Sequence, residues 1–316
     1  MLIALLLQTP TQSPVQLLKA EAAALAPLVE SSLTRRWLAH VDELKEPSAR
    51  AVFRTRTGEY LTLRKAEAQP REKRGELRRR RLPASFYYST MYGSPLAYSR
   101  LVDLAARHGL RELKGKKVLD FGFGSVGHLQ LLAHAGSEAH GIEVDQLLKA
   151  VYSEPGDTGR IGRGSVHLHF GFFPTDQKLN TEVGGGYDLI TSKNTLKRGY
   201  IHPERPAPKE QLVDLGVNDL EFLKEIHARL KPGGLFVVYN LSPQQAPADK
   251  PYMPWADGRF PFARDVTEQA GFEVLEWDTN DLPWAQSMGR ALRWDKSGTD
   301  LEKNLQAEAT VLRRKR

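Results

Sequence analysis

Five short apolar runs that alternate with helical segments constrain the fold of this chain more than any other feature. They are VLDFG (118–122), AHGIEVD (139–145), VHLHFG (166–171), YDLITS (187–192) and LFVVYN (235–240). Strands that alternate with helices are typical of βαβ units, which build a parallel sheet with right-handed crossovers. The sequence therefore predicts a doubly wound, mostly parallel α/β domain that begins near residue 111.

The first 110 residues have a different texture and are expected to form a separate appendage. Residues 16–44 mix Leu, Ala and Glu in a loosely helical pattern, and residues 51–63 alternate around a Thr-Gly turn as a β-hairpin does. Four Tyr and one Phe follow within residues 85–98. We divide the chain into an apolar leader or disordered N-terminus at 1–15, an N-terminal cap at 16–110 and an α/β domain at 111–316.

The apolar stretch at residues 1–7 is too short to cross a membrane, because a spanning helix needs about 20 apolar residues. No other stretch reaches that length, so the sequence predicts no transmembrane segment. The stretch also lacks the basic residues that open a secretory signal. We expect a cytoplasmic protein, with export through a short cleaved signal as the alternative.

Two short basic runs carry the net charge of +7. Residues 71–81 hold seven basic and two acidic residues, a net of +5, and residues 313–316 add +4, which leaves −2 for the remainder. Such runs permit a nucleic-acid partner, but we favour a solvated surface run and a frayed tail. The absence of Cys excludes thiolate catalysis, disulfides and cysteine metal sites.

The turn after the first predicted strand has the spacing of a nucleotide-binding loop. Gly122, Gly124 and Gly127 follow that strand and precede a helix. Glycines let the backbone approach a ligand closely, and the helix N-terminus behind them presents free N–H groups to polar ligand atoms. Glu143 ends the next strand 21 residues after Gly122, where a carboxylate accepts hydrogen bonds from a ribose diol. The two features together predict a cofactor that contains a ribose.

Four motifs occur in an order that resembles the class I S-adenosylmethionine-dependent methyltransferases: VLDFGFG (118–124), HGIEVD (140–145), YDLITSKNTL (187–196) and ARLKPGGLFVVYN (228–240). The resemblance covers residues 115–243. It implies a seven-stranded Rossmann-like sheet, with FEVLEWD (272–278) and AEATVLRR (307–314) as the sixth and seventh strands. It also implies S-adenosylmethionine as cofactor and methyl transfer as activity. We expect a small-molecule acceptor, which the sequence does not identify.

The resemblance assigns cofactor contacts residue by residue. Asp120 would orient the glycine turn and lie near the methionine amino group, and Glu143 would hold the ribose hydroxyls. The full set of expected cofactor contacts is Asp120, Gly122, Phe123, Gly124, Glu143, Val144, Phe172 and Asn194.

The chain departs from the family pattern at two places. Val126 stands where many members have the third glycine, and Gly127 follows one place later, which leaves a nicotinamide cofactor as an alternative. The acid that often follows the third strand is also missing, since Phe172 and Phe173 stand there. Adenine is therefore expected to be held by packing and backbone contacts, with Asp176 as a distant substitute.

Polar side chains crowd the loop after the fourth predicted strand, where ligands of an open parallel sheet bind. Methyl transfer needs an aligned nucleophile and, for a hydroxyl or an ammonium, a group that removes a proton. His202 is the leading candidate base, because an unperturbed imidazole titrates at about pH 6.5. Tyr200 and Lys193 complete the expected catalytic set. Lys197 and Arg198 are candidates for binding an acidic substrate.

Several assignments stay open at this point. The tyrosine cluster at 87–98 either packs into the core or folds over the cofactor through Tyr92 or Tyr98. His167 and His169 lie on one strand face, but we expect no metal site there. The alternatives to small-molecule methylation are methylation of RNA or protein that uses the basic runs, a non-catalytic nucleotide-binding domain and, less favoured, an NAD-dependent oxidoreductase.

Overall fold

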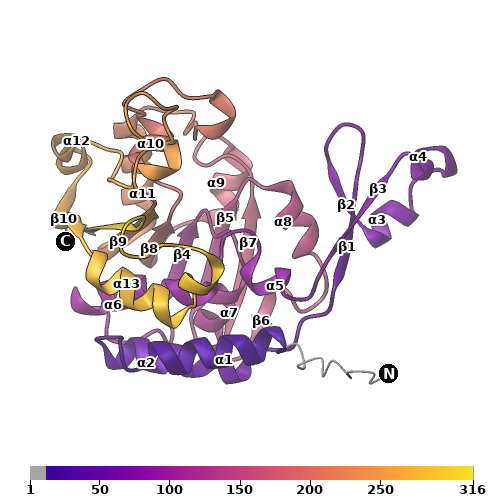
Figure 1. Ribbon diagram of the computed structural model, residues 1–316, viewed down its shortest axis with the longest axis horizontal. Coiled ribbons are helices and arrows are strands. Elements are labelled where there is room, and N and C mark those ends of the chain that lie inside the picture. The colour runs from indigo at the N-terminus through magenta and orange to yellow at the C-terminus, as the bar shows by residue number, and fades with distance from the viewer. Residues whose placement is uncertain (1–11, 316) are drawn as a thin grey trace, which may run out of the picture.

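The computed structural model describes residues 12–315, which form a three-layer α/β/α body and a projecting arm (Figure 1). The central sheet of the body has eight strands in the order β10-β11-β9-β8-β4-β5-β7-β6. They are β4 (Lys117–Phe121), β5 (Glu138–Glu143), β6 (Gly159–Ile161), β7 (Gly164–Phe170), β8 (Tyr187–Lys193), β9 (Leu230–Ser242), β10 (Phe272–Asn280) and β11 (Gln306–Arg314).

The predicted doubly wound, mostly parallel sheet is confirmed. Strands β4, β5, β7, β8 and β9 are parallel, and β11 lies antiparallel between β9 and β10. All seven predicted strands are present, but the predicted number is one too low. The additional strand is β6, which pairs antiparallel with β7 at the edge of the sheet. Its three residues are too few to show a hydrophobic period in the sequence.

Helices cover both faces of the sheet. One face carries α1 (Pro14–Leu25), α2 (Ser32–Ala39), α6 (Ser99–Arg107), α7 (Gly127–His134), α8 (Gln146–Val151) and α13 (Leu282–Ala291). The other face carries α9 (Gln177–Val183), α11 (Asp219–Arg229) and α12 (Arg264–Gln269). Side-chain caps fix several helix starts: a capping box closes α1 at Ser13, and Asn218 accepts a hydrogen bond from the first turn of α11.

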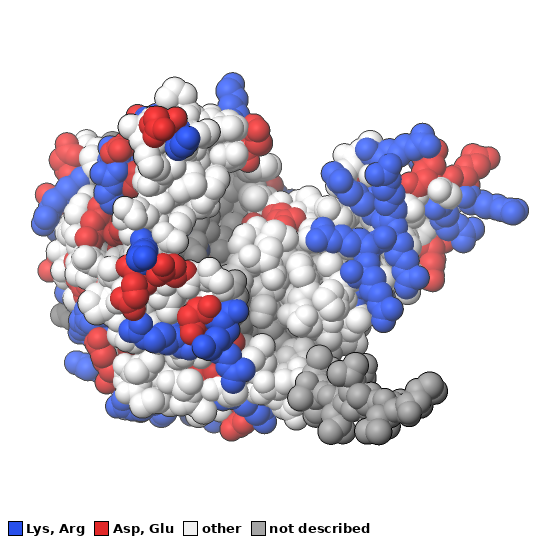
Figure 2. Space-filling view, in the orientation of Figure 1, with Lys and Arg blue, Asp and Glu red and all other residues white. Residues whose placement is uncertain are grey.

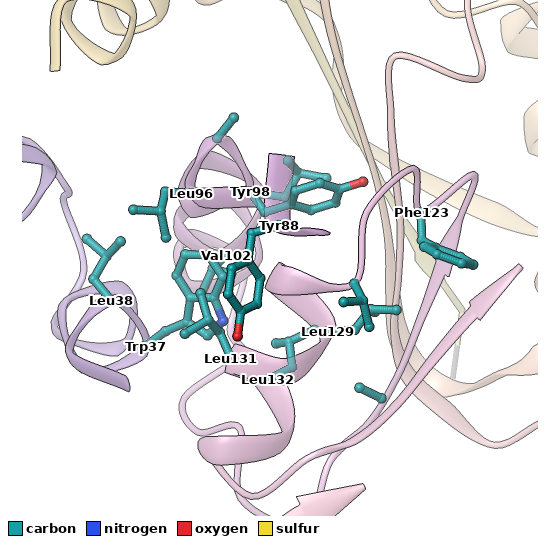
Figure 3. Close-up of a cluster of buried hydrophobic side chains, with 14 of the residues drawn as sticks. Trp37, Leu38, Tyr88, Leu96, Tyr98, Val102, Phe123, Leu129, Leu131 and Leu132 are labelled. Carbon is teal, nitrogen blue, oxygen red and sulfur yellow. The ribbon is translucent and has the colours of Figure 1, made fainter. Parts of the chain in front are cut away.

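Buried side chains from the expected cap and from the expected α/β domain share one hydrophobic cluster (Figure 3). Trp37 and Leu38 of α2 and Val102 of α6 belong to it, together with Leu131 and Leu132 of α7, and each is at most 5 % exposed. Burial of an aliphatic or aromatic side chain contributes about 1.5–3 kcal/mol. The N-terminal helices are thus held as part of one layer of the body. The domain division at residue 110 stays a prediction.

A three-stranded antiparallel sheet forms the arm. Its order is β2-β1-β3, with β1 (Arg50–Arg54), β2 (Tyr60–Thr62) and β3 (Arg78–Leu82), and α3 (Leu63–Glu67) and α4 (Arg71–Gly75) connect β2 to β3. The hairpin predicted at 51–63 is confirmed. The basic run at 71–81 forms α4 and most of the edge strand β3. Figures 1 and 2 show that this sheet projects from the body.

The expectation of a frayed basic C-terminus is wrong for the described residues. Arg313 and Arg314 are the last residues of β11, which is hydrogen-bonded to a strand on each side. Arg313 pairs with Glu273 at 3.2 Å, and Arg314 donates hydrogen bonds to the carbonyls of His227 and Ala228. These two arginine side chains therefore stabilise the end of β11 against its neighbours.

The leader predicted at residues 1–15 lies mostly outside the described residues, which begin at residue 12, and α1 starts at Pro14. Within residues 12–315, no helix combines the length and the apolar character that a bilayer crossing requires.

A buried ion pair joins α6 to the start of α13. Arg100 is 3 % exposed and donates hydrogen bonds of 2.8 and 2.6 Å to the two carboxylate oxygens of Asp281. It donates a third, of 2.7 Å, to Glu30, and its guanidinium lies over the ring of Trp284. The Arg100 guanidinium therefore connects α6 to two segments that are far from it in the chain, at Glu30 and at Asp281.

Asp281→Ala is expected to lower the free energy of unfolding by about 3–5 kcal/mol, because it leaves the Arg100 guanidinium buried without its main partner. The matched control is Glu302→Ala, which removes the partner of Arg290 from an exposed pair of 2.8 Å. The control substitution should lower the free energy of unfolding by less than about 1 kcal/mol. Urea denaturation followed by circular dichroism measures both values. Equal losses would show that the buried pair does not hold α6 to α13.

Candidate functional site

The topological switch point of the sheet lies between β4 and β8. From β4 the chain continues outward through β5 and β7, and then returns to build β8 and β9 on the other side. Ligands of open α/β sheets bind outside the carboxyl ends of the strands at such a point. Two cavities lie there: an apolar cavity of about 180 Å³, and a larger one of about 440 Å³ that we call the polar cavity because Glu143, Lys193, Asn194, Lys197 and Tyr200 line it. Both are lined by Gly122, Glu143, Val144, Thr195 and Val213.

The glycine turn follows β4 and forms part of both cavity walls. Gly122 and Gly124 take positive φ angles of 78° and 57°, which glycine adopts without strain. A Cβ at Gly122 would lie 2.1 Å from Thr195 Oγ1, and one at Gly124 would lie 2.9 Å from the ring of Tyr92. Phe123 between them contributes to the polar cavity, although it is 1 % exposed and its ring contacts that of Phe170.

Asp120 lies beneath this turn and is fully buried. One carboxylate oxygen accepts a 2.7 Å hydrogen bond from the Tyr98 hydroxyl and lies 2.9 Å from His128 Nε2, and the other accepts 2.6 Å from the Thr191 hydroxyl. Burial lowers the pKa of His128, which favours a neutral ring that donates Nε2–H to the carboxylate. Asp120 lines neither cavity, so the geometry does not support its expected contact with a ligand amino group. Its three partners hold β4, β8, α7 and the segment before α6 together.

Glu143 occupies the wall that the two cavities share. It is 9 % exposed, and its oxygens accept hydrogen bonds from the backbone N–H groups of Gly124, Val144 and Asp145, at 3.2, 2.8 and 3.3 Å. Burial raises the pKa of this carboxyl, and the three N–H groups oppose that rise. A carboxylate has about four acceptor positions, and three are taken here, so one position remains, on Oε2, for a hydroxyl donor. Val144, half exposed, lines both cavities beside it.

The apolar cavity suits a flat ring. Phe172 lines it with 66 % of its surface exposed, which is unusual for a phenylalanine. The segment 212–215 also lines this cavity, and its Asp214 is exposed and accepts a hydrogen bond from Gly216 N–H at 2.8 Å. Asp176, the expected substitute acid, caps α9 instead by accepting from two backbone N–H groups. Sequence reasoning missed residues 212–215, because a Pro-rich loop without periodicity carries no local signal.

Lys193 ends β8 and lines the polar cavity. Its side chain is 8 % exposed, and no hydrogen bond or ion pair to any described residue holds its ammonium group. The ammonium lies 5.4 Å from the centre of the Tyr98 ring. Burial lowers the pKa of Lys193 to about 8, although the negative charge of Asp120 opposes this shift. This group is therefore available to pair with an anion or, when neutral, to accept a proton.

Lys197 and Tyr200 line the same cavity. Lys197 is 3 % exposed and donates hydrogen bonds to the carbonyls of Leu241 and Trp255, at 2.6 and 2.9 Å. Burial, followed by the charge of Lys193, lowers the pKa of Lys197 to about 7. Burial raises the pKa of the Tyr200 hydroxyl, which stays protonated at neutral pH.

Asn194 lines the polar cavity, but its side-chain oxygen is engaged elsewhere. It accepts a 2.7 Å hydrogen bond from the backbone N–H of Leu241, and the backbone N–H of Asn194 donates to Tyr239 and Asn240. These bonds hold Asn194 at a φ of 62°, which few residues other than glycine adopt. Its oxygen is therefore a link between the ends of β8 and β9.

His202 lies outside the two cavities. Its side chain is 45 % exposed and contacts Asp219 at 2.9 Å, on an open surface hollow beside α11. His202 therefore lies apart from the polar cavity, and its assignment as the base stays a prediction. Its position follows from α10 (Arg198–Ile201), whose single turn ends before His202 and which the sequence did not predict.

A histidine cluster lies on the sheet face that α9 covers. One ring nitrogen of His140 lies 2.8 Å from Glu138 Oε1 and the other lies 2.9 Å from His169 Nε2, and His167 stacks on the His140 ring. Burial lowers the pKa of His140 to about 4. Possible ligand atoms of Glu138, His140 and His167 lie within 4.8 Å of one another. The same Glu138 oxygen also pairs with Lys117 at 3.4 Å, so a hydrogen-bonded network accounts for this cluster.

Comparison with known proteins yields structural similarity alone. No family model and no curated protein sequence matches this chain. The solved structures that it resembles include a [4+2]-cyclase named SpnF, with 17% identity, a TM-score of 0.42, and coverage of 68% of this chain and 80% of that one. They also include an S-adenosylmethionine-dependent methyltransferase from Mesorhizobium loti, with 13% identity, a TM-score of 0.40, and coverage of 67% of this chain and 96% of that one. Magnesium protoporphyrin IX methyltransferase from Synechocystis has 12% identity, a TM-score of 0.39, and coverage of 70% of this chain and 83% of that one.

The fold agrees with the expectation from the sequence motifs of a doubly wound, mostly parallel Rossmann-like sheet. The strand order and the glycine turn carry this assignment. A fold of this type hosts more than one chemistry, so the reaction must be argued from the site.

Gly122→Ala is expected to lower the free energy of unfolding by about 1–3 kcal/mol, because the new Cβ meets Thr195 and the positive φ strains any other residue. Gly75→Ala is the matched control, since a Cβ there has no neighbour within 4 Å, and its effect should stay within about 0.5 kcal/mol. Adding Thr195→Ala to Gly122→Ala should restore part of the loss. Denaturant titration provides all three values, and identical stabilities for the two glycine variants would contradict this account of the turn.

Proposed function

We propose that the two cavities bind S-adenosylmethionine and that the protein transfers a methyl group to an acceptor in the polar cavity. One observation carries this proposal: the glycine turn, the buried Glu143 carboxylate and the exposed Phe172 ring converge at the switch point of the sheet. These three features match, in spatial order, the amino-acid portion, the ribose and the adenine of that cofactor.

The residues present fit each part of the cofactor. The apolar cavity offers Phe172 and the segment 212–215 to the adenine, with the exposed Asp214 carboxylate as an acceptor for its amino group. Glu143 retains one acceptor position, on Oε2, for a ribose hydroxyl at the junction of the cavities. The backbone of Gly122 and Gly124 lines the polar cavity beside the amino-acid chain of the ligand, while Thr195 and Tyr92 fill the places that Cβ atoms would take. When bound, the cofactor supplies an electrophilic methyl carbon on a sulfonium centre.

Lys193 is the residue best placed to remove a proton from the acceptor. A pKa of about 8 leaves a substantial neutral fraction at physiological pH, and the neutral amine takes a proton from a hydroxyl or an ammonium nucleophile. Tyr200 lines the same cavity and donates a hydrogen bond that orients the acceptor. Tyr92 lies across the glycine turn and, with the segment 212–215, restricts the access of water. Catalysis then consists of alignment and proton removal.

Calorimetric titration with S-adenosylmethionine tests the cofactor. Glu143→Gln is expected to weaken binding about tenfold to a hundredfold, because it removes a charged acceptor that hydroxyl donors require. Glu182→Gln changes an exposed acid on α9 as the matched control and should leave the dissociation constant unchanged. NADH titrated into the same protein is the competing ligand. If NADH alone binds, the oxidoreductase alternative replaces this proposal, and if neither ligand binds, the proposal fails.

Lys193→Met is expected to lower kcat about 10²- to 10⁴-fold with little change in cofactor affinity, because it removes the proton acceptor and keeps the length of the side chain. Formation of S-adenosylhomocysteine with a panel of hydroxyl, amine and carboxylate acceptors provides the assay. The wild-type rate should rise with pH through about 8, since the lowered pKa makes Lys193 neutral above that value.

Lys193→Arg separates the two possible roles of this residue. An arginine stays protonated and cannot accept a proton, so it should be as inactive as methionine. Recovery of activity by arginine would show instead that the residue binds an anionic acceptor as a cation. Lys149→Met on the exposed side of α8 is the control and should keep full activity.

A further inference from the structure

We propose that the arm, residues 50–82, is a docking surface for the phosphate backbone of nucleic acid. This segment contains twelve basic and four acidic residues, a net of +8, whereas the whole chain carries +7. The remaining residues therefore carry −1. Figure 2 shows the arm as a dense group of Lys and Arg side chains set apart from a body of mixed charge. The net charge of the protein is thus concentrated in one projecting element.

The guanidinium groups of the edge strand β3 are free to bind a ligand. Residues 78–81 are four consecutive arginines, all exposed, and none of them forms a side-chain hydrogen bond or ion pair with a described residue. Arg50 at the base of the arm differs, since it donates hydrogen bonds of 2.6 and 2.8 Å to the buried Asp157 and secures the arm to the body. The arm therefore has a structural arginine at its base and a row of four unpaired arginines on its edge strand.

The pairing of the strands places positive charge on both faces of the arm. Arg78 lies opposite Arg54, and Arg80 lies on the same face, while Arg79 and Arg81 point to the other. One or two charges are enough to protect an edge strand from pairing with another chain. Four consecutive arginines beside a further basic helix exceed that need, and like charges this close repel one another. A polyanion removes that repulsion.

Arginine content and low apolar exposure favour nucleic acid over a membrane surface. Ten of the twelve basic residues are arginine, whose planar fork binds phosphate through two hydrogen bonds and stacks on bases. A membrane-surface element pairs its basic residues with exposed apolar side chains that enter the interface. Among the described residues of the arm, Leu63 is the one large apolar side chain more than half exposed. The surface therefore matches phosphates and lacks a lipid-binding face.

Fluorescence anisotropy with labelled single-stranded RNA, double-stranded RNA and double-stranded DNA tests the proposal on the full chain. The variant replaces Arg78, Arg79, Arg80 and Arg81 with Gln. At about 0.1 M salt we expect at least about tenfold weaker binding, and a salt dependence of log K shallower by about 3, since each phosphate contact contributes about 0.7–0.9 to that slope. Replacement of the same four residues with Lys keeps the charge and should keep the slope.

The matched control removes four exposed charges from the body, with Lys178, Lys224, Lys250 and Arg264 replaced by Gln. It should bind like the wild type. Circular dichroism and the thermal midpoint establish that each variant is folded. The proposal is overturned if the wild type binds no nucleic acid, if the control loses as much affinity as the arm variant, or if the arm binds phosphatidylserine vesicles and no nucleic acid. Binding of RNA by a chain that fails to bind S-adenosylmethionine would uphold this proposal and reject the proposed methyl transfer.

Discussion

The buried carboxylate of Asp120 is the interaction on which the geometry of the site depends. A carboxylate removed from water is costly unless hydrogen bonds surround it, and here Tyr98, His128 and Thr191 supply them. These partners come from the segment before α6, from α7 and from β8. The end of β4 is thereby fixed to each element that shapes the glycine turn. A shift of any one element would break a hydrogen bond to a charged group, which is worth about 1.5–3 kcal/mol.

The same carboxylate also affects the pKa of Lys193. Tyr98 donates a hydrogen bond to Asp120, and its ring stacks on the His128 ring with 3.5 Å between the ring centres. The Lys193 ammonium lies 5.4 Å from the centre of the Tyr98 ring, and both residues line the polar cavity. Burial favours the neutral amine, and the negative charge of Asp120 favours the cation. Burial has the larger effect and lowers the pKa of Lys193 to about 8, and the negative charge of Asp120 prevents a larger decrease. In the proposed reaction, Asp120 is therefore a positioning residue that acts through Tyr98 and Lys193, whereas the family resemblance implied a direct contact with the ligand.

The parts of the structure that the sequence predicts well are those with local signals. Strand β4 is apolar on both faces, so its run of Val118 and Leu119 marks a central strand, and the positive φ angles of Gly122 and Gly124 follow from the glycine spacing. Residues whose role depends on distant partners were not predictable in this way. His202 turns away because a single helical turn precedes it, and the segment 212–215 becomes a cavity wall only because the loop after β8 folds back over β5 and β7.

The roles of the basic residues were also not predictable from local sequence signals. The sequence places basic runs at 71–81 and at the C-terminus, but only the pairing of strands separates their roles. Arg314 donates to backbone carbonyls inside the body, and the arginines of β3 face solvent on an edge strand. A third positive region, Lys193 and Lys197, is buried at the switch point, where burial lowers both pKa values. The exposed arginines of the arm suit a polyanion by long-range attraction, whereas partly neutral lysines in a cavity suit proton transfer at short range. Under the two proposals, basic residues of one formal charge serve chemically different tasks, and their depth of burial decides which task each can serve.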